Sequence, residues 1–211
     1  AIYGRAYQRD DNGNILLSST GSPQYDTNQY LGNLLPDFTG GASSYMTFKN
    51  FSLGLDFDFQ KGGKLFSVTR MFNAYSGLGA ETIGNNALGN PQRDPVTGGG
   101  ASVALADADT DSGGILIEGV DSNTGEPVSY LVEAQTYWGR LFALHERWLY
   151  DASYFKLRQA RLDYTIPKNV LENTFIKQAN IGVFATNLWL IYTSVDGIDV
   201  SELEDNQGAG E

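Results

Sequence analysis

The sequence predicts an all-β fold of antiparallel strands, and three observations lead to this class. Residues 160–166 alternate apolar and polar side chains, as a strand with two different faces requires. Residues 51–60 repeat that alternation with five bulky apolar side chains. Glycine at 25 of 211 residues and an aromatic share of 12% fit many tight turns between aromatic-rich strands. A membrane barrel wall and a soluble sandwich share these traits, so composition leaves both open.

The first third of the chain contains an expected strand, an irregular stretch and a hairpin. Residues 2–9 alternate in the manner of a strand and run into a turn cluster at 10–14. Residues 17–36 are rich in Ser, Thr, Gly, Asn and Pro without a period, which predicts irregular surface structure. The clearest hairpin is expected at 38–61, where Lys49 and Asn50 connect two alternating strands.

A long excursion at about 70–149 follows, with helical patterns at 71–82 and 132–148. Gly114 to Ile117 reads as the start of a strand. Two more amphipathic strands are expected within 150–192, the first ended by Pro167, because proline cannot donate to a β-ladder. We expect four to five strands in an up-and-down order, and no closing strand in the acidic tail at 196–211.

Several protein classes fit poorly. A net charge of −11 and a pI near 4.4 disfavour nucleic-acid binding, which needs clustered Lys and Arg. The absence of cysteine excludes a disulfide framework and thiolate metal sites. The chain begins without a signal-peptide pattern and has no apolar run near the ~20 residues of a transmembrane helix. Alternating barrel strands would show no such run.

The run SYFKLRQARLDYTIPKNVL at 153–171, followed by NLWLIY at 187–192, resembles the C-terminal barrel signature of SusC/RagA-type TonB-dependent outer-membrane transporters. Residues 31–69 resemble the preceding hairpin of that family, and residues 113–130 resemble its long loop. One departure lies at 197–202, where family members typically carry Asp-Pro-Glu.

The resemblance implies that residues 1–211 are the C-terminal part of one barrel domain of about 22 strands, a transmembrane wall fragment with a long, partly helical extracellular loop. The plug domain and closing strand would be absent. The implied function is nutrient import, of oligosaccharide or peptide, across the outer membrane of a Gram-negative bacterium. The implied partners are the rest of the barrel and its plug, a SusD-like surface lipoprotein, TonB and outer-membrane lipid. The alternative is a soluble secreted all-β carbohydrate-binding module, in which the apolar faces form a core.

Charged residues on the expected strands are the first candidate site. They would line the substrate path or contact the plug. The second role is favoured for Arg158, Arg161 and Asp163 because charged pairs brace barrel interiors, and simple solvation in the lumen is favoured for Asp56 and Asp58. The set is Asp56, Asp58, Arg158, Arg161 and Asp163.

Aromatic residues near the end of the excursion are the second candidate site. Tyr137, Trp138, Trp148 and Tyr150 could contact a ligand or a partner, or form a core within the loop, and these readings are evenly balanced.

Catalytic and metal sites find little support. Asp107, Asp109, Asp111 and Glu118 have the spacing of a calcium loop, but Ser112 stands where that loop needs glycine, so a solvated acidic loop is favoured. The only histidine, His145, lacks the neighbours of a zinc or triad site, and packing or surface exposure is expected. We therefore expect no enzyme and no cofactor.

Overall fold

The computed structural model describes residues 1–98 and 100–202, and the chain divides into two compact units. The first, which we call the mixed unit, contains residues 1–32 and 66–149. The second, the sheet unit, contains residues 33–65 and the chain from residue 150 onward. Residues 66–149, which lie between two neighbouring strands of the sheet unit along the chain, thus form the mixed unit together with residues 1–32.

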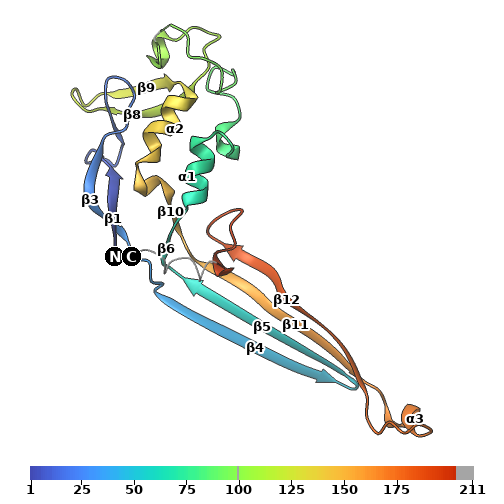
Figure 1. The fold of residues 1–211 in the computed structure, drawn as a ribbon. Helices are drawn as coiled ribbons and strands as arrows, with labels where there is room; N and C mark the ends of the chain where they lie inside the picture. The colour runs from blue at the N-terminus through green and yellow to red at the C-terminus, as the bar shows by residue number, and fades with distance from the viewer. Residues whose placement is uncertain (99, 203–211) are drawn as a thin grey trace. The chain divides into compact units, whose positions relative to one another are not determined.

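The sheet unit is a four-stranded antiparallel sheet with the order β12-β11-β5-β4 (Figure 1). Each strand pairs with the one that precedes it in this unit, so the predicted up-and-down order is confirmed. The hairpin turn at Lys49 has a φ of 54°, and the strand before Pro167 ends at Thr165. A short helix, α3, lies in the link before the last strand. The elements are β4 (Phe38–Phe48), β5 (Phe51–Lys61), β11 (Tyr154–Thr165), α3 (Lys168–Leu171) and β12 (Asn180–Thr193).

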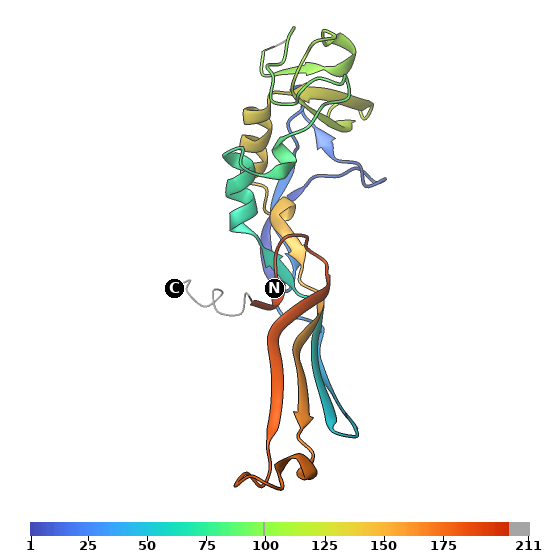
Figure 2. The same cartoon turned by 90° about the vertical axis from the view of Figure 1, so that its right-hand side faces the viewer.

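The mixed unit contains two sheets and two helices (Figures 1 and 2). A two-stranded antiparallel ribbon joins β1 (Ile2–Tyr7) to β3 (Tyr25–Gly32). A four-stranded sheet has the order β2-β8-β9-β7. Its strands and the helices are β2 (Leu16–Leu17), β7 (Ser102–Ala104), β8 (Ile115–Asp121), β9 (Pro127–Val132), α1 (Val68–Tyr75) and α2 (Ala134–Phe142).

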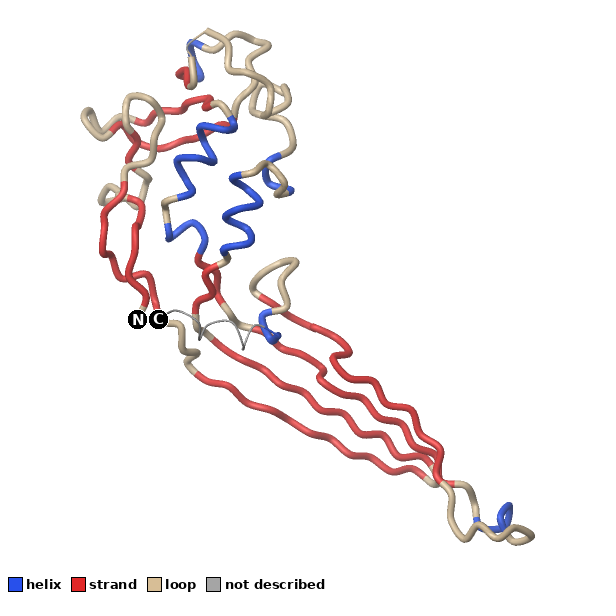
Figure 3. The backbone as a smooth tube through the Cα atoms, viewed as in Figure 1, coloured by secondary structure: helices blue, strands red, loops and turns tan. Residues whose placement is uncertain are grey.

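Short elements complete the described chain, as the tube in Figure 3 shows by colour. Two brief strands form a separate two-stranded sheet, and the remaining helical turns are of the 3₁₀ type. They are β6 (Lys64–Phe66), β10 (Leu149–Asp151), η1 (Ala80–Thr82), η2 (Leu105–Asp107), η3 (His145–Trp148) and η4 (Val200–Glu202). Within residues 1–98 and 100–202, no helix is long and apolar enough to cross a membrane.

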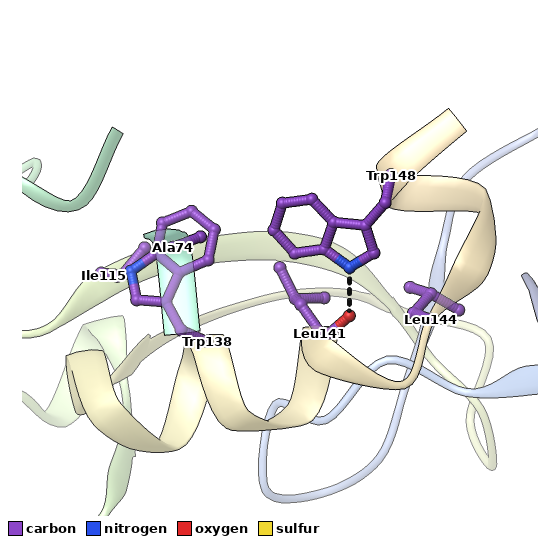
Figure 4. Packing of buried hydrophobic residues seen from close by; sticks show 6 residues of the cluster. All are labelled: Ala74, Ile115, Trp138, Leu141, Leu144 and Trp148. Atoms are coloured by element: carbon purple, nitrogen blue, oxygen red, sulfur yellow. Dashed lines mark hydrogen bonds between the residues drawn. The ribbon is translucent and has the colours of Figure 1, made fainter. Parts of the chain in front are cut away.

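Buried aromatic and aliphatic side chains form the main core of the mixed unit (Figure 4). Trp148 is 0% exposed, and its Nε1 donates to the Leu141 carbonyl at 2.8 Å. The α1 helix that supplies Ala74 to this core begins at Ser67, whose hydroxyl accepts from the Arg70 backbone N–H at 3.2 Å. The buried members are Ala74, Ile115, Trp138, Leu141, Leu144 and Trp148.

Most predicted elements are confirmed, and two expectations were wrong. The strand near Ile2, the hairpin, both helical patterns and the strand after Gly114 are present. The irregular stretch at 17–36, however, contains β3, and the described chain has more strands than the four to five expected. Most side chains of β3 are exposed, so neither face imposed an apolar alternation on its sequence. The expectation of no closing strand concerns the tail, of which residues 203–211 lie outside the described residues.

Candidate functional site

One face of the sheet unit is almost wholly apolar. The strand register aligns five cross-strand rows on this face. Glycine at position 40 leaves room for the ring of Phe59, since an added Cβ would lie 2.6 Å from that ring. From one end of the sheet to the other, the rows are Gly40, Phe59, Phe155 and Tyr192; Ala42, Phe57, Leu157 and Trp189; Ser44, Leu55, Ala160 and Ala185; Met46, Leu53, Leu162 and Val183; and Phe48, Phe51, Tyr164 and Ile181.

Aromatic side chains gather at the two ends of this face and are sparse between them. The end rows on β5 are Phe51 and Phe59, eight residues apart, or about 27 Å along the strand at ~3.4 Å per residue. At a tilt of ~40° this corresponds to about 21 Å of membrane thickness, close to the ~25 Å apolar band of membrane barrels, which aromatic girdles flank. Phe48, Val183 and Trp189 are 72%, 69% and 62% exposed. The face therefore presents a large apolar surface to its surroundings.

The opposite face carries the charged residues, and a β-bulge brings them together. Lys156 and Arg158 have even numbers, whereas Arg161 and Asp163 have odd numbers, so strict alternation would separate them. The pairing of β11 with β5 shifts between Leu157 and Gln159, which inserts an extra residue. Both charged runs consequently share one face.

The candidate charged residues form two ion pairs. Arg158 Nε lies 2.6 Å from Asp58 Oδ2, and this pair joins β11 to β5. Arg161 Nε lies 2.6 Å from Asp163 Oδ2, within β11. Asp56 lies in register with Ser43 on one side and Gln159 on the other. The structure thus places all five predicted residues on one face, but not in one cluster.

Lys156 is a charged residue that the sequence reasoning missed. Its side chain is 1% exposed, and its Nζ donates to Asp199 Oδ2 at 2.7 Å and to Ser201 Oγ at 2.8 Å. Arg158 also donates to the Ser201 carbonyl. These bonds hold the segment after β12 against the polar face. The alternation of apolar and polar residues along this strand could have placed Lys156 on the polar face. It could not have predicted the partners of Lys156, which lie more than forty residues away in the sequence.

Burial and hydrogen bonding act in opposite directions on Asp199. Partial burial favours the neutral acid, but the hydrogen bonds from Lys156 and Ser201 outweigh it and lower the pKa of Asp199 below its ordinary value. The same segment packs Val195 and Val200 against Ala152, so polar and apolar contacts hold it together.

A shallow depression of about 450 Å³ lies beside the Arg161 pair on the polar face. Its wall includes Gly182, where an added Cβ would meet Asp163 Oδ1 at 2.1 Å. Glycine at 182 therefore permits the close approach of the Asp163 carboxylate to β12.

The four candidate loop aromatics are divided between the two units. Trp138 and Trp148 are buried in the core of the mixed unit, and Tyr137 packs against it. Tyr150 instead packs against a smaller cluster in the sheet unit. In this structure the two tryptophans serve as core residues.

The acidic spacing at 107–118 is divided between a loop and a strand. Asp107 ends η2, whereas Glu118 lies on β8. Residues 1–98 and 100–202 contain no grouping of three or more His, Asp or Glu side chains suited to a metal ion. His145 is a packing residue, since its Nδ1 accepts from the Arg5 backbone N–H at 3.1 Å and its ring contacts Phe66 edge-on.

Comparison with known proteins gives distant matches over most of the chain. No protein-family model matches it. TonB-dependent receptor P3 of Formosa agariphila is 23% identical over 192 residues, which is 90% of this chain and 15% of the receptor. A solved structure of the RagAB peptide transporter matches 95% of this chain and 20% of that chain, with a TM-score of 0.52 and 19% identity. The RagAB peptide importer in its "open-open" state matches 92% and 19%, with a TM-score of 0.51 and 16% identity.

Like the resemblance seen in the sequence, these matches cover most of the chain. The names of the matched proteins describe a receptor and a peptide transporter, and none describes an enzyme. The chain spans about a fifth or less of their length. Over most of its length, this chain is a distant match to a TonB-dependent receptor and has the fold of the corresponding part of RagAB.

Proposed function

We propose that the sheet unit is a segment of the wall of a TonB-dependent importer in the outer membrane of a Gram-negative bacterium. The observation that carries this proposal is the contrast between the two faces of one sheet. One face has five apolar rows with aromatic ends, and the other has Asp56, Asp58, Arg158 and their charged neighbours. A barrel wall between lipid and a polar lumen requires this contrast.

In this proposal the chain is the C-terminal part of one barrel domain, and β4, β5, β11 and β12 are its membrane-spanning segments. Residues 66–149 of the mixed unit, which lie between β5 and β11 in the chain, are then an extracellular excursion. The edge strands β4 and β12 would pair with strands of the remaining barrel, because an unpaired edge in lipid leaves backbone groups without partners. The matches to TonB-dependent receptor P3 and to RagAB support this arrangement.

The whole transporter would import an oligosaccharide or a peptide, and the RagAB likeness favours a peptide. Its partners would be the plug, a SusD-like surface lipoprotein, and TonB, which supplies energy. No bond is made or broken in such a mechanism. The Arg158–Asp58 pair would brace neighbouring strands, whereas the exposed Arg161 pair is the better candidate for contact with plug or substrate.

A soluble carbohydrate-binding module is the alternative. A sandwich would cover its apolar face with a second layer. Phe48, Val183 and Trp189 are instead more than 60% exposed in the described chain. Their exposure supports a membrane wall.

Extraction from native outer membranes tests the proposal. The membranes are solubilised in mild detergent, and intact mass and size-exclusion chromatography determine what accompanies this chain. We expect it within a much larger polypeptide that co-migrates with a lipoprotein. A free 23 kDa monomer that needs no detergent would contradict the membrane proposal and support the soluble module.

A further inference from the structure

A cavity of about 520 Å³ lies at the N-terminal end of α2 in the mixed unit. Its walls come from three segments that are distant in sequence. We propose that this cavity binds the carboxylate of a small ligand. The assignment of this ligand to transport rests on the proposed function, but the binding itself does not. The residues that would contact the ligand are Arg93, Glu133, Ala134, Gln135 and Trp138.

The indole N–H of Trp138 is a donor without an acceptor. Trp138 is 5% exposed, and its Nε1 has no hydrogen-bond partner among the described residues. Leaving such a group unpaired costs about 1–3 kcal/mol. In Figure 4 this nitrogen lies on the side of the ring toward the N-terminal end of α2, where the cavity is, whereas Trp148 donates to Leu141. This nitrogen has almost no accessible surface, so a ligand acceptor would satisfy it after a small turn of the indole toward the cavity that Trp138 lines.

The first turn of α2 supplies further donors. No side chain caps this helix, because Glu133 at the cap position accepts no backbone N–H. The backbone N–H groups of Ala134, Gln135 and Thr136 precede the first intrahelical bond, which Tyr137 makes to Glu133. Unpaired N–H groups and the helix dipole together favour an anion at this end.

Arg93 adds a positive charge that is fixed in place. Its Nε donates to the Thr82 carbonyl at 2.8 Å, and its Nη2 donates to Thr82 Oγ1 and to the Gly77 carbonyl. All these partners are neutral, and no ion pair joins Arg93 to an acidic residue of the described chain. A guanidinium held by neutral groups retains its charge for a ligand carboxylate.

Glu133 determines what else the ligand must offer. Its carboxylate accepts from Thr136 Oγ1 at 3.3 Å and lines the same cavity. It repels a simple anion, but it can accept from an N–H or O–H of the ligand. The matching chemistry is therefore a carboxylate next to a hydrogen-bond donor. A peptide C-terminus and a uronic acid both have this chemistry.

Calorimetry on the full chain in detergent tests the cavity with three probes: trialanine, trialanine amide and glucuronic acid. We expect at least one of the two carboxylates to bind and the amide to bind at least tenfold more weakly. Binding of trialanine or of glucuronic acid distinguishes the two sources. The proposal is overturned if neither carboxylate binds or if the amide binds as well as the free acid.

Two variants test the assigned donors. Trp138→Phe removes the unpaired N–H together with part of the buried ring system, so binding should weaken roughly fivefold and the thermal midpoint should also fall. Glu133→Gln should strengthen binding of trialanine relative to the wild-type chain, because it removes the negative charge that repels the ligand carboxylate but retains an acceptor for the neighbouring N–H. Unchanged affinity in Trp138→Phe would remove the indole from the site and contradict the proposal. Extraction from membranes tests the proposed wall without any ligand. A negative result there is therefore distinguishable from a negative result for the carboxylate site.

Discussion

The two units differ in how far their large apolar side chains are buried, as one tryptophan from each unit shows. Trp148 in the mixed unit is fully buried, and its N–H is bonded to a backbone carbonyl. Trp189 in the sheet unit is 62% exposed, within a face of similar residues. The mixed unit therefore buries its large apolar side chains within itself, whereas in the proposed importer lipid and neighbouring strands would cover the apolar face of the sheet unit.

The largest effect is expected for Trp148→Ala. Removing a fully buried tryptophan leaves a cavity and should lower the free energy of unfolding of the mixed unit by about 3–5 kcal/mol. Trp189→Ala is the matched control and should leave that unit unchanged. Unfolding in guanidinium, monitored by the protease sensitivity of residues 66–149, measures the free energy of unfolding in both variants. Equal effects of the two substitutions would remove the contrast.

Leu55→Lys should destabilise the sheet unit in lipid but have little effect in the mixed unit. Leu55 lies in the central apolar row, and a lysine at the bilayer midplane costs about 2–4 kcal/mol. Ser43→Lys, on the polar face opposite Asp56, is the control and should be tolerated. The measurement is unfolding of the transporter reconstituted in lipid vesicles. A similar cost at both positions would mean that the apolar face does not contact lipid.

Asp199→Ala should cost about 1–3 kcal/mol, because it removes the carboxylate that accepts from the buried Lys156 ammonium. The pKa of Asp199 is lower in the folded chain than its unfolded value of ~3.9. The pair therefore stabilises the fold above that value, and its contribution is lost as the pH falls through the lowered pKa. Acid unfolding of the wild type should show this loss and the variant should not. The exposed Glu172→Ala is the control.

Tyr7 should make the mixed unit sensitive to alkali. Burial, helped by the nearby Tyr137, raises the pKa of Tyr7 to about 12. In the unfolded chain it ionises near 10, so stability present below pH 10 is lost as the pH rises toward 12. Tyr7→Phe should reduce this loss in alkaline unfolding monitored by circular dichroism. An identical alkaline transition in the variant would exclude Tyr7 as its source.

Arg161→Ala is expected to have the smallest effect on stability. Its side chain is 60% exposed and pairs with Asp163 in solvent. The melting temperature in detergent should not change, whereas Arg158→Ala, which breaks a cross-strand pair, should lower it. Nutrient uptake by cells carrying Arg161→Ala then separates a role in transport from a role in the wall. Unchanged uptake would leave Arg161 without a function in the importer.

The sequence predicted the elements whose two faces lie in different surroundings. The alternation in β5 and β11 follows from an apolar and a polar face, so the hairpin and both late strands were predictable. The polar β3 lacks such a contrast and was missed. The bulge at Arg158 was also missed, because only cross-strand pairing reveals an inserted residue. The cavity at α2 joins three distant segments, a proximity that local patterns cannot predict.

Spin-label accessibility at two adjacent residues of β4 distinguishes a face that contacts lipid from a face that contacts water. The chain has no cysteine, so single cysteines at Met46 and Thr47 can carry nitroxides in the transporter reconstituted in lipid. Met46 belongs to an apolar row, and Thr47 lies on the opposite face. We predict that oxygen from the bilayer relaxes the label at 46 and that a water-soluble nickel complex relaxes the label at 47. Equal accessibility of both labels to the nickel complex would contradict a membrane-spanning wall.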